Sequence, residues 1–264
     1  MTALAQYATS LGLLGAIVAL FLVLEFRVPH RESQRPDVLR MVHATVLFAS
    51  GVLLTRLILP IGLVSAAIHA GNNGWGVLNA TDMPLWVAVP VAILALDATN
   101  YARHWAEHTV PLLWRIHRLH HSDEQVDLST AFRFHPFEAV FSSLCQLGTI
   151  LMLGLPIEGV LLHIVLAAVF DLWEHSNIRT PDGLKRLATI FVTPPVHRIH
   201  HEVKDAATAR NYGTILTLWD RVAGTYQTPA IREQPAKYGL REGGRHRITG
   251  LIQMLEDPVR RGKP

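Results

Sequence analysis

The chain has 264 residues, of which 50% are hydrophobic and only 17% are charged, whereas soluble proteins average about 25% charged residues. A net charge of +3 could indicate a nucleic-acid-binding protein. However, the arginines flank apolar runs, so we expect them to contact anionic lipid, and we expect no nucleic-acid partner. The composition therefore predicts a membrane protein, and a single cysteine, Cys145, excludes an internal disulfide.

The first apolar run covers residues 11–24 and extends back to Leu4. It lacks the charged start and the small-residue cleavage site of a signal peptide, so we expect a retained membrane span. Residues 25–40, which follow it, are rich in arginine. Because basic loops lie on the cytoplasmic side, we expect the N-terminus to lie outside.

The second apolar run, residues 42–70, is interrupted by Arg56 and Pro60. It is either one tilted helix or a span followed by a bent or re-entrant piece. A turn-rich loop follows at 71–76. The third run, residues 84–96, continues without a helix breaker into the first histidine cluster.

The fourth and fifth runs, residues 137–155 and 157–173, are separated by little more than Gly154 and Pro156. Each approaches the ~20 residues needed to cross a bilayer, so we predict a membrane hairpin over 137–173. We therefore expect an all-α integral membrane bundle of about four to five spanning or re-entrant helices. Every histidine cluster then lies in a cytoplasmic helical cap. We divide the chain into N-terminal membrane helices (1–83), a histidine-rich domain (84–228) and a polar tail (229–264).

Histidine is unusually frequent, with 15 residues, and nine of them form four short clusters. Side chains three and four positions apart share one face of an α-helix, so each cluster could present its imidazoles together. The clusters are His104-x(3)-His108, His117-x(2)-His120-His121, His175 and His197-x(2)-His200-His201.

The ligand type narrows the choice of metal. Imidazole suits iron, zinc, copper and nickel, whereas structural zinc needs only four ligands, usually with cysteine. Nine histidines are too many for one ion and suit two. Carboxylate di-iron sites use Glu and Glu-x-x-His, a pattern that this chain does not show. We therefore predict a nitrogen-rich pair of iron ions, which zinc could replace during purification.

These boxes, in this order after three apolar runs, resemble the fatty acid hydroxylase/sterol desaturase superfamily. The flanking segments 134–138 (Phe-His-Pro-Phe-Glu), 211–213 (Asn-Tyr-Gly) and 219–226 (Trp-Asp-Arg-Val-Ala-Gly-Thr-Tyr) are similar to family motifs. The resemblance covers roughly residues 85–228. It implies a metal-ligand role for His104, His108, His117, His120, His121, His175, His197, His200 and His201.

The resemblance also implies chemistry and partners. A di-iron centre would reduce O2 with two external electrons and hydroxylate, or less favourably desaturate, a C–H bond of a lipid substrate. We expect the electrons to come from a separate cytochrome b5- or ferredoxin-like electron-transfer protein. One departure is Asp171, which stands where sphingolipid-type hydroxylases carry a histidine. It could bind metal, but we favour a role in orienting a ligand imidazole.

Several further residues have predicted supporting roles. His135 could complete the ligand set or line the substrate path. Asp97 shares a helical face with His104, and we expect it to pair with a ligand imidazole or with Arg103. Trp219 and Asp220 could form a lid or pack the C-terminal segment, and Asn211 belongs to the same motif region. We expect Glu107 and Glu174 to be solvated or ion-paired, and His163 to hydrogen-bond to a neighbouring helix.

Two other functions compete with lipid oxidation. A histidine-rich metal-binding or transport protein would have histidines along a path through the membrane, whereas here they gather at the ends of apolar runs. A two-metal hydrolase would need an open metal position and usually carboxylate ligands. Oxidation of a lipid C–H bond explains the pattern best.

Overall fold

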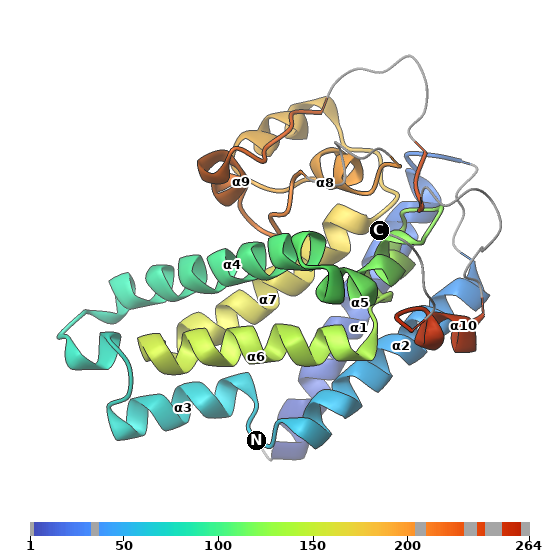
Figure 1. Ribbon diagram of the computed structural model, residues 1–264. Coiled ribbons are helices and arrows are strands. Elements are labelled where there is room, and N and C mark those ends of the chain that lie inside the picture. Colours follow the sequence, from blue (N-terminus) through green and yellow to red (C-terminus); the bar gives the residue numbers. More distant parts are fainter. Residues whose placement is uncertain (1–2, 33–36, 204–209, 230–236, 241–249, 260–264) are drawn as a thin grey trace.

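The computed structural model describes the backbone of residues 3–32, 37–203, 210–229, 237–240 and 250–259, and all side chains of these residues except those up to residue 11 and at 13 and 14 (Figure 1). Over these residues the chain forms helices and three isolated β-bridges, which confirms the all-α prediction. The elements are α1 (Ala3–Arg27), α2 (Val38–Ile58), α3 (Leu63–Asn73), η1 (Leu78–Ala80), α4 (Leu85–Thr109), α5 (Pro111–His121), η2 (Leu128–Phe132), α6 (Pro136–Leu153), α7 (Ile157–His175), η3 (Asp182–Thr189), α8 (Pro194–His200), α9 (Leu218–Ala223) and α10 (Leu251–Glu256).

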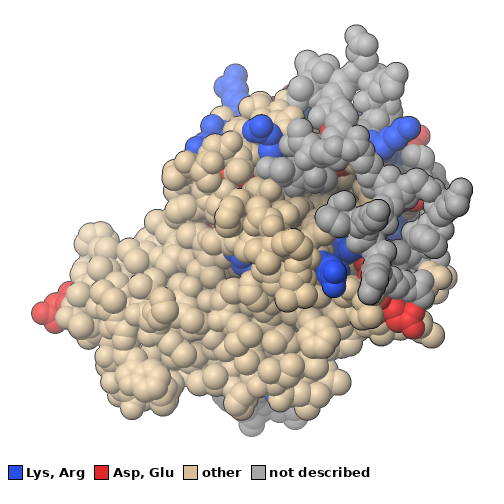
Figure 2. Space-filling model, in the orientation of Figure 1, with Lys and Arg blue, Asp and Glu red and all other residues tan. Residues whose placement is uncertain are grey.

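Three described stretches are long and apolar enough to span a membrane: Val38–Asn72, Leu85–Thr109 and Pro136–Leu153. Large apolar side chains point outward from them, including Leu57 (73% exposed), Trp86 (79%) and Met152 (71%). Figure 2 shows that the face over α3 and α6 is largely free of charged residues, which lie mostly towards the α8–α9 and α10 sides, apart from one acidic residue at the left tip. Burying such a surface in lipid is favourable, so the protein is a membrane protein.

The predicted count of about four to five spanning or re-entrant helices stays a prediction, because the three stretches come from the described residues alone. The helix α7 has the length of a span but carries Glu158, Asp171 and Glu174, and these charges exclude it from the three apolar stretches. The second apolar run, residues 42–70, forms a helix followed by a separate bent piece and not one continuous helix. The helix α2 ends at Ile58 and α3 begins at Leu63, on either side of Pro60.

The helical hairpin between α6 and α7 forms as the sequence predicts. Gly154 caps α6 in the left-handed conformation (φ 67°), which glycine adopts at little cost. Pro156 follows as the N-cap of α7. The chain therefore reverses within a few residues, and α6 and α7 both lie against α4.

The histidine-bearing helix ends gather in one region. The helix α4 ends at Thr109 and α5 starts at Pro111, so the chain turns between the first two histidine clusters. Proline suits the first position of a helix because the amide N–H has no intrahelical partner there. The helix α5 packs on α4, and α8 packs on the end of α7 that carries His175 (Figure 1).

Small residues let the helices of the bundle approach closely. A Cβ atom built on Gly159 of α7 would lie 2.5 Å from the Cβ of Ala92 on α4 and 3.3 Å from the carbonyl oxygen of Val89. By contrast, a Cβ atom on Gly148 of α6 would meet nothing within 4 Å. Small residues at such crossings are typical of packing between membrane helices.

We expect Gly159→Ala to destabilise the protein and Gly148→Ala not to. Gly159→Ala overpacks the α4–α7 crossing and should cost about 1–3 kcal/mol. Gly148→Ala should be neutral or stabilising by up to ~1 kcal/mol, because alanine is the better helix former. Thermal unfolding in detergent checks both; equal midpoints for the two variants would contradict the close approach.

The C-terminal region was predicted as a polar tail over 229–264, and parts of it (230–236, 241–249 and 260–264) lie outside the described residues. Its described part contains α10, whose Met254 packs against Leu47 and Leu119. The side chain of Asp257 pairs with Arg118 at 3.1 Å. This segment therefore packs against the helix that carries the second histidine cluster.

Candidate metal centre

The nine predicted histidines converge into two groups from four separate segments. The first group contains His104, His108, His117, His121 and His200; the second contains His120, His175, His197 and His201. Within each group every residue offers one ring nitrogen, and these nitrogens all lie within 4.8 Å of one another. The two groups adjoin: the rings of His121 and His201 stack with centroids 4.6 Å apart. The two groups thus form two neighbouring candidate metal positions.

The two His-x(2)-His-His boxes divide their ligands crosswise. His117 and His121 enter the first group and His120 the second, whereas His197 and His201 enter the second group and His200 the first. Each residue advances by about 100° around a helix, so residues four apart differ by about 40° and adjacent ones by about 100°. The first and last histidines of each box therefore enter one group, and the middle histidine enters the other.

The spacing of the ring nitrogens fits metal ions. The Nε2 atom of His175 lies 3.0 Å from Nε2 of His120 and 2.9 Å from Nε2 of His197. Nε2 of His201 lies 3.0 Å from that of His197, and in the first group Nε2 of His121 lies 3.2 Å from that of His117. Two nitrogens bound to one ion at about 2.0–2.1 Å are roughly 3 Å apart when their bonds are near a right angle.

Buried nitrogens without partners give independent support. The Nε2 atoms of His104, His108 and His200 are buried and have no hydrogen-bond partner. Buried polar atoms are normally hydrogen-bonded, and leaving them unpaired is costly. All nine rings are buried except that of His108, which is partly exposed. The residues present therefore fit a pair of metal ions held by imidazole.

The outer ring nitrogens of four ligands are held by oxygen atoms. Nδ1 of His104 donates to the carbonyl of Tyr212 at 2.9 Å, and Nδ1 of His200 donates to that of Arg210 at 2.9 Å. Nδ1 of His175 donates to the carbonyl of Asp171 at 2.8 Å. A donor role for Nδ1 fixes the tautomer and leaves Nε2 with a lone pair for a metal.

The fourth such ligand, His117, donates from Nδ1 to the Glu138 carboxylate at 2.9 Å. Glu107 lies 3.6 Å from the same nitrogen. Arg103 pairs with Glu107 at 2.6 Å and with Glu138 at 3.7 Å. Among these residues the sequence singled out Glu138 only as part of a motif, and it predicted a solvated or ion-paired Glu107. The spacing of Arg103 and Glu107, one helical turn apart beside His104, could have signalled a buried pair.

The two acidic residues near His175 differ in exposure. Glu174 is 2% exposed, so of the solvated or ion-paired role expected for it the solvated alternative is wrong. Its Oε2 lies 3.6 Å from Nδ1 of His197. The Asp171 side chain is 31% exposed, and its Oδ1 lies 3.4 Å from Nδ1 of His175. The Asp171 carboxylate thus lies beside the outer nitrogen of His175 and outside both histidine groups.

His135 also lies outside both groups. It is the N-cap of α6, where its Nδ1 accepts from the backbone N–H of Phe137 at 3.3 Å. Its Nε2 donates to the carbonyl of Leu255 at 3.2 Å. Both ring nitrogens are therefore engaged by backbone.

Asp97 contacts neither of the partners expected for it, a ligand imidazole or Arg103. Its carboxylate accepts hydrogen bonds from the backbone N–H groups of Ile215 and Leu216, each at 3.2 Å. It also accepts one from the indole N–H of Trp219 at 2.8 Å. Through these hydrogen bonds, Asp97 holds residues 215–216, just before α9, against α4. Trp219 takes part in this packing.

Asp220 and Asn211 organise the loop that supports His104. Asp220 accepts hydrogen bonds from the backbone N–H groups of Tyr212 (2.9 Å) and Gly213 (2.8 Å). Asn211, at a φ of 57°, donates to the carbonyls of Val196 and Gln227 at 3.0 Å. The loop that offers the Tyr212 carbonyl to His104 is therefore fixed from both sides.

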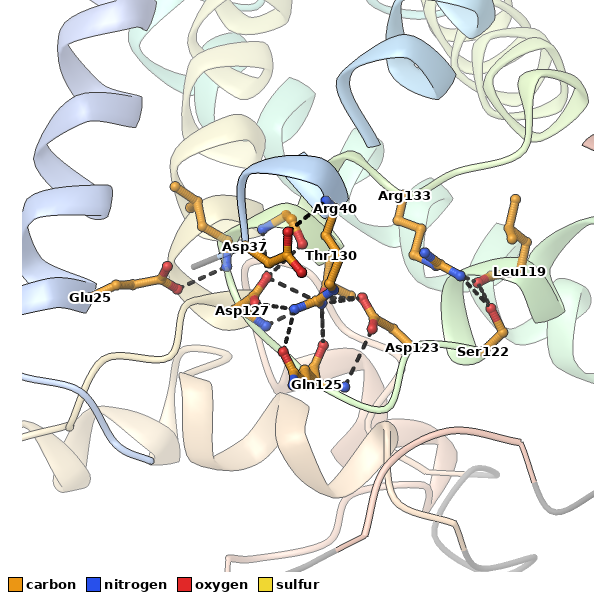
Figure 3. A network of polar contacts seen from close by, with 12 residues as sticks. Glu25, Asp37, Arg40, Leu119, Ser122, Asp123, Gln125, Asp127, Thr130 and Arg133 are labelled. Atoms are coloured by element: carbon orange, nitrogen blue, oxygen red, sulfur yellow. Dashed lines mark hydrogen bonds and ion pairs between the residues drawn. The ribbon is translucent and has the colours of Figure 1, made fainter. Parts of the chain in front are cut away.

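N-terminal residues brace the loops that follow the second and third histidine boxes (Figure 3). Arg40 pairs with Asp123 at 2.7 Å and with Asp127 at 2.6 Å. Glu25 accepts from the backbone N–H of Leu128 at 2.8 Å and from that of Asn177 at 2.6 Å. The sequence did not signal these contacts, since the partners are 83 or more positions apart. They tie α1 and α2 to the metal centre.

Two arginines within the histidine boxes make contacts inside the protein. Arg198 is 5% exposed and donates to the carbonyls of Ser176 (2.8 Å) and Ile178 (3.0 Å). Arg118 pairs with Asp257. His163 is 1% exposed and neither ring nitrogen has a hydrogen-bond partner, so the predicted bond to a neighbouring helix is wrong.

Protonation of the ligands is strongly disfavoured. Burial, followed by repulsion from neighbouring imidazoles, lowers the pKa of His120 and His121 well below 6.5. Burial lowers the pKa of His200 to about 4. Neutral imidazole is the form that binds metal.

We expect acid to destabilise the metal-free protein. The unfolded chain takes up protons at histidine near pH 6.5, whereas the folded state resists protonation until about pH 4 at His200. Stability is therefore fully present above the unfolded pKa and falls as the pH drops through this window. Unfolding midpoints measured across the window check this; a midpoint that rises on acidification would contradict it.

A model of the fatty acid hydroxylase family matches residues 89–225. The match covers more than half of the chain and includes all nine histidines of the two groups. The chain therefore belongs to the fatty acid hydroxylase family, within the fatty acid hydroxylase/sterol desaturase superfamily, as its motifs predicted.

Named relatives are lipid-oxidising enzymes. The chain is 28% identical to ornithine lipid hydroxylase OlsE of Rhizobium tropici over 180 residues, which cover 68% of this chain and 53% of that protein. It is 33% identical to alkylglycerol monooxygenase of Danio rerio over 150 residues, which cover 57% of this chain and 32% of the relative. The chain thus spans about half of the first relative and a third of the second. No solved structure matches the chain.

Proposed function

We propose that this protein is a membrane-embedded di-iron oxygenase that hydroxylates a C–H bond of a lipid. The observation that carries the proposal is the convergence of nine histidines into two adjoining groups with ring nitrogens about 3 Å apart. Relatives named for an ornithine lipid and for alkylglycerols support a lipid substrate. Hydroxylation is preferred over desaturation because both relatives are named as a hydroxylase or a monooxygenase.

The nine histidines would hold two iron ions, or zinc acquired during purification. Bound iron supplies the redox chemistry by which O2 oxidises an unactivated C–H bond. In the balanced reaction, one oxygen atom of O2 enters the lipid C–H bond and the other leaves as water. Two electrons and two protons are consumed, and the electrons come from a separate cytochrome b5- or ferredoxin-like protein.

The residues of the chain prepare the site for this reaction. The carbonyls of Tyr212, Asp171 and Arg210 hold three ligand rings in place, and Glu138 holds a fourth. Burial of the rings excludes bulk water, which protects reactive species from side reactions. His108 is the one ligand that is partly exposed, so we expect the lipid to approach from its side. Asp171 would orient His175 without binding metal.

The arrangement in the membrane belongs to the same proposal. The arginine-rich stretch after α1 favours a cytoplasmic position for the loop between α1 and α2. The N-terminus would then lie outside and the metal centre on the cytoplasmic face. A centre at the membrane face suits a lipid that enters sideways from the bilayer.

A metal transporter fits the geometry less well. The nine histidines gather at one end of the bundle, and among the described spans and α7 only His163 lies buried away from them. A transport path needs polar groups along the depth of the membrane.

Comparative lipid mass spectrometry tests the function. Cells that make the wild-type chain are compared with cells that make the variant His120→Ala. A lipid that gains one oxygen atom only with the wild-type chain supports hydroxylation, whereas loss of two hydrogens would show desaturation. If no lipid differs between the cells while the purified protein carries metal ions across vesicle membranes, the transporter replaces the proposal.

A further inference from the structure

Three carboxylates lie buried directly around the nine histidines. Glu107 is 0% exposed, and Glu138 and Glu174 are each 2% exposed. They come from three helices, α4, α6 and α7, and each lies within 3.6 Å of the outer nitrogen of His117 or His197. None of the three can therefore be a solvated surface group.

The protein itself supplies little positive charge to balance them. Arg103 contacts Glu107 and Glu138, but within the described part of the chain Glu174 contacts no lysine or arginine. Each carboxylate also keeps one buried oxygen without a hydrogen-bond partner: Oε1 of Glu107, Oε2 of Glu138 and Oε2 of Glu174. Buried charges are normally paired, because an uncompensated one is strongly destabilising.

Glu107 and Glu138 do not form a third metal site with His117. Although Glu107, His117 and Glu138 offer three close ligand atoms, the guanidinium of Arg103 lies 2.6 Å from Glu107 and would repel a cation. His117 also directs its Nε2 towards the first histidine group, 3.2 Å from Nε2 of His121. The acidic groups therefore lie outside the positions that the histidines surround.

The set of histidine ligands explains which positive charge the three carboxylates balance. Imidazole binds metal in its neutral form, so nine histidine ligands leave the positive charge of two cations uncompensated. We infer that Glu107, Glu138 and Glu174 are the counter-charges of the metal pair, and that they raise metal affinity through the histidines without binding the ions. This inference rests on the metal centre of the proposed function.

Charge can be separated from shape by changing glutamate to glutamine. Glu138→Gln keeps an oxygen that can accept from Nδ1 of His117, and Glu174→Gln keeps the volume of the side chain. Glu158→Gln is the matched control, since Glu158 lies in the first turn of the same helix as Glu174 but is exposed at its far end. Glu174→Asp restores the charge and serves as the rescue variant.

The experiment measures Zn2+ binding to the full chain in detergent by competition with a chelator, together with unfolding midpoints of the metal-free and Zn2+-loaded forms. We expect Glu138→Gln and Glu174→Gln to weaken Zn2+ binding by about 10–100-fold, and Glu158→Gln to bind as the wild type does. Glu174→Asp should bind more tightly than Glu174→Gln. The metal-free midpoint of Glu174→Gln should equal or exceed that of the wild type, because the variant removes a buried charge that contacts no lysine or arginine among the described residues.

A purely structural role predicts the opposite pattern. If the glutamine variants bind Zn2+ as tightly as the wild type, or lower the midpoint of the metal-free form as much as that of the loaded form, the inference is overturned. The result is independent of the reaction, because Zn2+ supports no redox chemistry. A chain that binds Zn2+ as expected but oxidises no lipid would leave the inference standing and remove the proposed function.

Discussion

Replacing His175 with alanine should abolish lipid oxidation and remove one of the two metal ions. The Nε2 atom of His175 lies within 3.0 Å of those of both His120 and His197, so it is central to the four-histidine group. Loss of residues that only support a ligand typically costs 10–100-fold in affinity or activity, and we expect loss of this ligand to cost more than about 100-fold. Metal content per chain and lipid mass spectrometry measure the two effects.

The control for this variant is His69→Ala. His69 is exposed on α3, at a distance from both histidine groups. Its replacement by alanine should therefore leave metal content and activity unchanged. The five-histidine group does not include His175, so the first metal position should survive in the variant. Retention of two metal ions per chain in His175→Ala would show that the second group is not a metal site.

Patterns within one helix made the main elements predictable. Apolar runs and the breakers Pro60, Gly154 and Pro156 gave the ends of α2, α6 and α7 to within a few residues. The histidine boxes were recognisable for a similar reason, because spacings of three and four positions have a fixed meaning on a helix. These features need no knowledge of the tertiary structure.

The division of the ligands between two metal positions could not be predicted in this way. The sequence places His117, His120 and His121 on one helical face, but it does not show that the middle histidine turns towards a different group. That outcome depends on how α5 lies against α8, which carries His197 and His200. Contacts between distant segments decide it.

Burial of the charged residues was the other feature that the sequence did not show. Glu107 and Glu174 resemble ordinary helix-surface residues until α4, α6 and α7 are packed together. Likewise, Arg40 and Asp127 are 87 positions apart, and nothing local relates them. Polar residues were thus correctly located on their helices while their partners remained unknown.

Replacing Asp220 with alanine should destabilise the protein by about 3 kcal/mol or more. The carboxylate is fully buried and accepts hydrogen bonds from the backbone N–H groups of Tyr212 and Gly213 and, at 2.7 Å, from the hydroxyl of Thr225. Each buried donor left without a partner costs about 1–3 kcal/mol, a large share of the ~5–15 kcal/mol that stabilises a typical domain. Thermal unfolding in detergent measures the loss.

Asp220→Ala should also weaken metal binding, because Asp220 positions Tyr212. When the backbone N–H of Tyr212 loses Asp220, its carbonyl no longer has a fixed position for Nδ1 of His104, which lies 2.9 Å away. Metal binding should therefore weaken together with stability. Asp220→Asn keeps one acceptor oxygen and should fall between the alanine variant and the wild type. The control is Asp182→Ala, because the Asp182 side chain is 93% exposed. If Asp220→Ala unfolds at the same temperature as Asp182→Ala and binds metal equally well, then the loop after α8 does not depend on Asp220, and His104 must be held by its helix alone.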